Sequence, residues 1–270
     1  MTSDQATTLT EIASTSDMDS FAFSLEGKRK GTFGVDVSAA PLEVLLEMSI
    51  RRRQLRCDGL DIKVCGQSAY LSLLRETSVD HRPTTTDSCG VFRFTGTPNA
   101  KTLEGMSEFL VRASKPIEQA RIPLSARQRL LGSLGELMDN VFEHSGFAEN
   151  ALAGYWIREK TLQIGVADNG QGILRAYHQQ PRWSQVADAG DALTLAVVDN
   201  RSRYGVGSRG TGFRNLVAAL RSLDVTLRVS SDDASIETDP RGADAHKFLI
   251  REKTPLIGFV VAAKIKLQGV

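Results

Sequence analysis

Apolar side chains recur at helical spacing in several segments of the chain, and Gly and Pro residues punctuate them. We expect helices over residues 41–53, 68–75, 102–114, 125–145, 191–199 and 212–223. Pro116 should end the third of these helices, because proline removes a backbone hydrogen bond from a helix interior. Gly146 should end the fourth, at a position where helices often adopt a left-handed residue.

Short apolar runs between these helices predict β-strands. They cover residues 61–66, 151–158, 161–168, 225–230, 246–250 and 256–267. The run TLQIGVAD, residues 161–168, is mostly apolar, as expected for a central strand. A tight turn at Glu159 and Lys160 should join it to the strand before it.

The order of the elements predicts an α/β protein with two structured regions. Residues 1–20 are polar and rich in Ser and Thr, which predicts a flexible tail. Residues 21–90 read as a small α/β domain that ends in a Pro- and Thr-rich loop, residues 80–90. Residues 91–270 form a larger domain, with a long irregular stretch at 173–209.

Composition excludes several classes of protein. A net charge of +1 over 270 residues gives no overall reason to expect nucleic acid or an anionic membrane as partner. No apolar run reaches bilayer-spanning length, and the N-terminus lacks the pattern of a secretory signal. Cys57, Cys65 and Cys89 show neither CxxC spacing nor a neighbouring His, so we expect reduced thiols in a cytoplasmic protein and no cysteine metal site.

The helix over 125–145 carries an unusual polar face within ELMDNVFEHS, residues 136–145. Opposite its apolar stripe lie Glu136, Asp139, Asn140 and Glu143, with His144 at the edge. This face lacks the Lys or Arg that would make ordinary helix ion pairs, and Glu136 and Asn140 are neighbours on successive turns. The pattern fits a solvated face and a hydrated Mg²⁺ site about equally well.

Two glycine motifs follow. In VADNGQGI, residues 166–173, Asp168 ends a strand and is followed by Gly170 and Gly172. This is either an ordinary turn or a carboxylate facing a ligand, where it could accept a hydrogen bond from an amino group such as adenine N6.

In RGTGFRNL, residues 209–216, Gly210 and Gly212 open a helix whose free N–H groups favour an anion. Arg201, Arg203 and Arg209 are either solvated loop residues or partners for phosphate charge.

The three motifs in this order resemble the GHKL superfamily of ATP-binding domains, over residues 101–270. The superfamily includes gyrase-type, chaperone, histidine kinase, mismatch-repair and anti-sigma-factor kinase domains. The resemblance implies an α/β sandwich, with helices on one face of a mixed sheet, and it implies ATP and Mg²⁺ as ligands. Residues 173–209 would then form the lid over the ATP.

The resemblance also assigns roles to single residues. Asn140 would coordinate Mg²⁺, and Glu136 would be the catalytic base. Asp168 would bind the adenine amino group, with Gly170 and Gly172 shaping its pocket. The phosphates would contact the end of the lid, at Arg209, Gly210, Thr211 and Gly212. His144 would contact the ligand on the side of the phosphates.

Departures from the superfamily narrow the choice of member. The upstream histidine, His81, lies in the loop at 80–90 and not on a dimerising helix, so we expect no complete histidine kinase. We also expect no gyrase or mismatch-repair enzyme, since no second domain follows to supply a lysine. What remains resembles the compact anti-sigma-factor kinases, and residues 21–90 are similar to a STAS-like module, their partner class, here joined in one chain.

Three functions stay open at this point. The first is a regulatory protein whose nucleotide-ordered lid controls a protein partner. The second is a slow ATPase or a Ser/Thr protein kinase with Glu136 as base. The third is a scaffold without nucleotide, which gives no physical reason for Glu136, Asn140, Asp168 and four glycines to occur together. The sequence does not determine the oligomeric state, and a homodimer stays open.

Overall fold

The computed structural model of the chain describes residues 9–66, 71, 83–86, 88–119, 122–144, 151–199, 201, 212–220, 223–238 and 247–267. Its helices are α1 (Thr15–Ser24), α2 (Leu42–Cys57), α4 (Ala100–Gln119), α5 (Leu124–His144), α6 (Ile173–His178), η1 (Pro181–Trp183), α7 (Ala189–Leu193), η2 (Thr194–Val198) and α8 (Gly212–Leu220). Its strands are β1 (Leu9–Glu11), β2 (Gly31–Asp36), β3 (Leu60–Cys65), β4 (Thr84–Thr85), β5 (Cys89–Arg93), β6 (Leu152–Arg158), β7 (Thr161–Asp168), β8 (Val225–Thr238) and β9 (Phe248–Lys266).

The N-terminal region is a parallel sheet with strand order β1-β2-β3, and α1 and α2 pack beside it. The predicted helix at 41–53 and strand at 61–66 are confirmed as α2 and β3. Of the predicted helix at 68–75, only Leu71 lies within the described residues.

The prediction of a flexible tail over residues 1–20 is wrong for its described part, which contains β1 and the start of α1. Ser14 caps α1, since its Oγ accepts a hydrogen bond from the backbone N–H of Asp17. Ile12, Met18 and Phe21 are buried in the N-terminal core. A few apolar residues at the right spacing therefore anchor a segment whose composition is otherwise polar.

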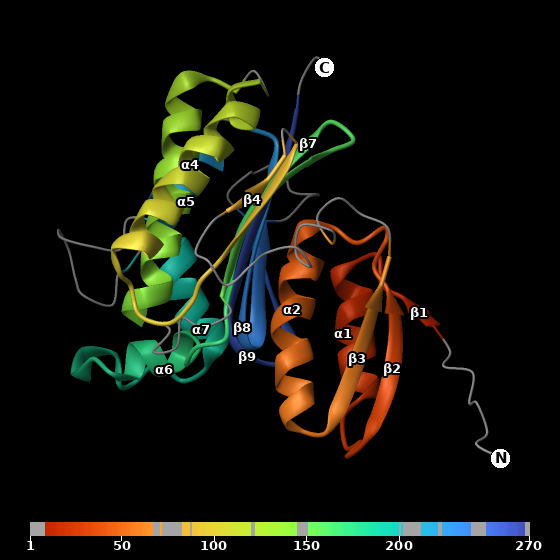
Figure 1. Cartoon of the computed structure of the whole chain (residues 1–270). Helices are drawn as coiled ribbons and strands as arrows, with labels where there is room; N and C mark the ends of the chain where they lie inside the picture. The colour runs from red at the N-terminus through yellow and green to blue at the C-terminus, as the bar shows by residue number, and fades with distance from the viewer. Residues whose placement is uncertain are drawn as a thin grey trace.

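The second sheet has six strands in the order β4-β5-β6-β7-β9-β8. Helices α4, α5 and α8 cover one face, and α2 covers the other, so that the layers run from helices through sheet and helices to the small parallel sheet (Figure 1). This confirms the α/β fold class. The prediction of a mixed sheet is wrong for the described strands, because every pair between them is antiparallel. The expected domain border at residue 90 falls within β5, which belongs to this larger sheet.

Helix α2 packs directly on the back of β7. The side chain of Gln163, in β7, is buried, and its Oε1 accepts a hydrogen bond of 2.7 Å from the N–H of Leu42 at the start of α2. Gly165 lies two residues further along β7, and a Cβ there would come within 2.7 Å of Leu46 Cδ1. The absence of a side chain at Gly165 therefore lets α2 approach the sheet closely.

Helix α4 continues through Pro116 to Gln119, so the prediction that Pro116 ends this helix is wrong. Ala113, Pro116 and Ile117 are all buried. An interior proline costs a helix about 3 kcal/mol, and this burial in the core offsets that cost.

The predicted irregular stretch at 173–209 contains four short helical elements in its described part, α6, η1, α7 and η2. Three of them place a residue in the core that also contains the apolar side of α5: Tyr177 in α6, Leu193 in α7 and Val197 in η2. The helix predicted at 191–199 is observed as the end of α7 followed by η2, a π-helix.

The predicted tight turn between β6 and β7 is confirmed. Glu159 and Lys160 have φ angles of 49° and 61°, as a two-residue hairpin turn of type I′ requires. The predicted strand at 225–230 is observed as the start of the longer β8, and the two strands predicted at 246–250 and 256–267 are one continuous strand, β9. Together β8 and β9 form a long antiparallel ribbon. None of the described helices has both the length and the apolar character needed to cross a membrane.

Candidate functional site

The alternation of side chains along β7 decides which way Asp168 faces. Leu162, Ile164 and Val166 belong to the core shared with α5, whereas Ala167 belongs to the core shared with α2. Asp168, the last residue of the strand, continues the first set and so lies on the α5 side of the sheet.

The Asp168 carboxyl is buried, and its Oδ1 accepts a hydrogen bond of 2.8 Å from the N–H of Gly170. Burial raises the pKa of Asp168 to about 7, and the bond from Gly170 offsets only part of this effect. A ligand group that donates a second hydrogen bond would stabilise the charged form. The end of β7 therefore offers a buried carboxylate that can accept a further hydrogen bond from a ligand.

Replacing Asp168 with asparagine should remove a pH dependence from the stability of the protein. A carboxyl whose pKa rises on folding stabilises the fold fully below its unfolded pKa, near 4, and that contribution is lost as the pH rises through about 7. Between about pH 5 and pH 8 the wild-type protein should lose about 2–3 kcal/mol relative to Asp168→Asn. Urea unfolding across this range measures the difference, and parallel profiles for the two proteins would contradict it.

The polar face of α5 divides into two pairs. Glu136 and Asn140 are half-buried, whereas Asp139 and Glu143 are exposed. Partial desolvation of its carboxyl, together with the nearby acids Glu143 and Glu136, raises the pKa of Asp139. Within the described part of the chain, the Asn140 amide makes no hydrogen bond, so it is available to a ligand.

Helix α8 brings the third motif to the same side of the sheet. Asn215 Nδ2 donates a 3.4 Å hydrogen bond to Glu136 Oε1, which ties α8 to α5. The Phe213 ring lies edge-on to Phe259, with 5.9 Å between ring centroids, and Phe259 is paired with Asp168 across β9 and β7. Gly212 opens α8. The three motif elements therefore meet on one face of the sheet.

Several predicted site residues cannot be placed in this arrangement. Arg203, Arg209, Gly210 and Thr211 lie outside the described residues, as does the side chain of His144. Arg201 is described, and its backbone carbonyl accepts a 2.6 Å hydrogen bond from the Tyr177 hydroxyl.

Gly172 has a structural partner that the sequence did not suggest. Its φ is +77°, and a Cβ there would lie 2.5 Å from Asp232 Oδ1. The Asp232 carboxylate instead occupies this space and accepts a 3.4 Å hydrogen bond from the N–H of Leu174, while Ser231 Oγ accepts one of 2.9 Å from Ile173. Gly172 thus allows Ser231 and Asp232 to cap α6, and burial raises the pKa of Asp232.

Sequence reasoning also missed Gly258. It has a φ of +117°, and a Cβ on it would come within 2.0 Å of the Asp168 carbonyl oxygen. Gly258 therefore permits close approach of β9 to the end of β7. The available signal was a single glycine within an apolar strand, which is typical of close backbone contact.

No group of three or more His, Cys, Asp or Glu side chains that could hold a metal ion occurs among the described residues. A cation at this face would therefore depend on Asn140, on water and on oxygens of a bound ligand, a combination that suits Mg²⁺ with phosphates. Cys57 and Cys65 are exposed and Cys89 is buried, and all three are free thiols.

No family model matches the chain, and a search of curated proteins found no match.

Proposed function

We propose that this protein binds Mg-ATP on the face of the sheet covered by α5 and α8, and that the bound nucleotide acts through the segment between α6 and α8 to control a protein partner. The observation that carries the proposal is the meeting of three polar elements there. These are the buried carboxyl of Asp168, the Glu136–Asn140 face of α5 and the N-terminus of α8 at Gly212.

Each element suits one part of the nucleotide. Asp168 is a buried acceptor for the adenine amino group, and Gly170 holds the carboxyl in place through its N–H. The Asn140 amide, which makes no hydrogen bond to the described residues, would offer its oxygen to Mg²⁺, which prefers oxygen ligands and keeps several waters. The start of α8, with Gly212 and the preceding Arg209, Gly210 and Thr211, would hold the phosphates.

We expect calorimetry of the intact protein to detect ATP binding in the presence of Mg²⁺. Asp168→Asn should weaken binding at least about tenfold, because a charge-assisted hydrogen bond contributes about 1.5–3 kcal/mol. Asn140→Ala should weaken Mg-ATP binding but leave metal-free ATP much less affected. Asp139→Asn is the matched control, since Asp139 is exposed on the same helix. Absence of ATP binding by the wild-type protein would refute the proposal.

The alternative within the same site is an enzyme, a slow ATPase or a Ser/Thr protein kinase with Glu136 as base. Its half-buried carboxylate already accepts a hydrogen bond from Asn215. If the wild-type protein releases phosphate, Glu136→Ala should abolish release while ATP still binds. Equal, near-zero turnover by both proteins would favour the regulatory function.

We also propose that the protein works in the cytoplasm. Cys57 and Cys65 are exposed and form no disulfide, which fits a reducing compartment.

A further inference from the structure

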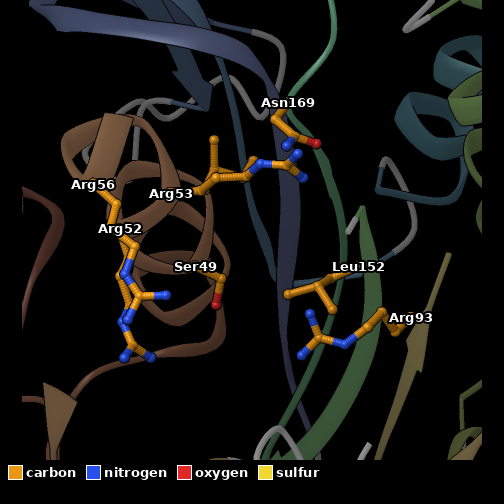
Figure 2. Close-up of a pocket in the computed structure, with 8 residues that line it drawn as sticks. Ser49, Arg52, Arg53, Arg56, Arg93, Leu152 and Asn169 are labelled. Atoms are coloured by element: carbon orange, nitrogen blue, oxygen red, sulfur yellow. The ribbon is translucent and has the colours of Figure 1, made fainter. Parts of the chain in front are cut away.

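A second polar site lies on the opposite face of the large sheet, between α2 and the ends of β5, β6 and β7. It is a cleft of about 340 Å³, lined by Ser49, Ile50, Arg52, Arg53, Arg56, Arg93, Leu152 and Asn169. Figure 2 shows Arg53 reaching from α2 toward Asn169, and Arg93 reaching toward α2 from the opposite wall. Four arginines thus gather in a volume typical of small-molecule sites.

The four arginines have different depths in the cleft. Arg52 and Arg56 are exposed at its rim, whereas Arg53 and Arg93 are half-buried. The buried side chains of Ile50 and Leu152 provide an apolar part of the wall. A ligand in the cleft would therefore meet positive charge from two walls and apolar surface between them.

The neighbouring Arg51 shows what a structural arginine looks like in this protein. It is buried, its Nε lies 2.7 Å from Glu47 Oε1, and its terminal nitrogens donate to the carbonyl oxygens of Thr254 and Pro255. None of the described residues that line the cleft is acidic. Arg56 lies 3.7 Å from Asp61, in a pair exposed to solvent that contributes little.

We propose that this cleft binds a small anion that carries phosphate groups. Like charges held close together repel, and an anion with several oxygens removes that repulsion. The guanidinium group is planar and donates paired hydrogen bonds that match phosphate oxygens, which lysine does not offer in the same geometry. A cleft of about 340 Å³ suits a compact phosphorylated molecule, whereas a nucleic acid would need a longer basic surface.

The cleft is distinct from the proposed nucleotide site. Asp168 faces α5, whereas its chain neighbour Asn169 lines the cleft on the α2 side. The cleft uses none of the residues assigned to ATP. An experiment can therefore disprove binding at one site without disproving binding at the other.

Pyrophosphate is the probe, titrated into the full chain at low ionic strength with EDTA present to exclude Mg²⁺. We expect binding that weakens at least tenfold in Arg52→Gln/Arg93→Gln, which removes one guanidinium from each wall. Arg52→Gln/Arg56→Gln changes only exposed residues and should show a loss of the same order without disturbing the fold. Arg112→Gln, on α4 across the sheet, should bind as the wild-type protein does.

Two further arms identify the anion. Citrate should bind at least tenfold more weakly than pyrophosphate, and equal affinity would overturn the assignment to phosphate. Vesicles with phosphatidic acid distinguish a lipid headgroup from a soluble molecule: binding to pyrophosphate alone assigns a soluble ligand, and arginine-dependent binding to the vesicles as well assigns a headgroup. The proposal is overturned if pyrophosphate does not bind, or if it binds both cleft variants as tightly as the wild-type protein.

Discussion

Replacing Lys253 with methionine should lower the free energy of unfolding by about 3 kcal/mol, since breaking a buried ion pair typically costs about 3–5 kcal/mol. Lys253 lies in β9, and its side chain is fully buried. Its Nζ is 2.7 Å from Glu47 Oε1 in α2 and 3.7 Å from Asp19 Oδ1 in α1. One cation thus joins the ribbon of the large sheet to both helices of the N-terminal region.

The loss should fall at the lower end of that range because Glu47 keeps a second partner. Burial alone would raise the pKa of Glu47, but Lys253 and Arg51 outweigh it and hold the pKa below its usual value. In Lys253→Met, Arg51 still neutralises Glu47, and Arg228 remains 3.4 Å from Asp19. The buried Asp19 Oδ1 atom, which accepts no hydrogen bond from the described residues, then loses the cation that lies 3.7 Å away.

Lys266→Met is the matched control, because it makes the same change on the same strand. Lys266 is 71% exposed and pairs with Asp224 at 3.0 Å, an arrangement that contributes about 0–1 kcal/mol. Chemical denaturation of the three proteins measures both effects. Similar losses for the two variants would show that the buried network does not fasten the N-terminal region to the ribbon.

Local patterns in the sequence predicted the local structure well. Helix α2 follows from the spacing of its leucines, and the β6–β7 hairpin follows from two apolar runs around a two-residue turn. The residues proposed for the nucleotide were also found this way, because Glu136 and Asn140 occupy one helix face and Asp168 ends a strand.

Contacts between distant residues were not predictable from such patterns. The continuation of α4 through Pro116 depends on burial against a core formed by other elements. The cap on α6 is supplied by Asp232, about 60 residues downstream on a strand. Likewise, the run of arginines in α2 reads as a solvated helix face until the fold brings Arg93 to the opposite wall.

Gly258→Ala should destabilise the protein by about 3 kcal/mol or more and weaken ATP binding as well. Two effects add at this position. A non-glycine residue at a φ of +117° is strained by about 1–3 kcal/mol. The new methyl group would also meet the Asp168 carbonyl oxygen at 2.0 Å, so β7 or β9 must move, and forced packing of this kind costs about 1–3 kcal/mol.

Gly96→Ala separates the two effects. Gly96 also has a positive φ, +60°, but a Cβ there meets nothing within 4 Å, so only the backbone strain of about 1–2 kcal/mol should appear. Thermal or urea unfolding of both variants gives the difference. The movement forced by Gly258→Ala acts on the residue that carries the buried carboxyl, so ATP affinity should fall in this variant and stay unchanged in Gly96→Ala. If Gly258→Ala costs no more than Gly96→Ala, the close approach of β9 to Asp168 does not hold in solution, and the buried acceptor proposed for adenine loses its support.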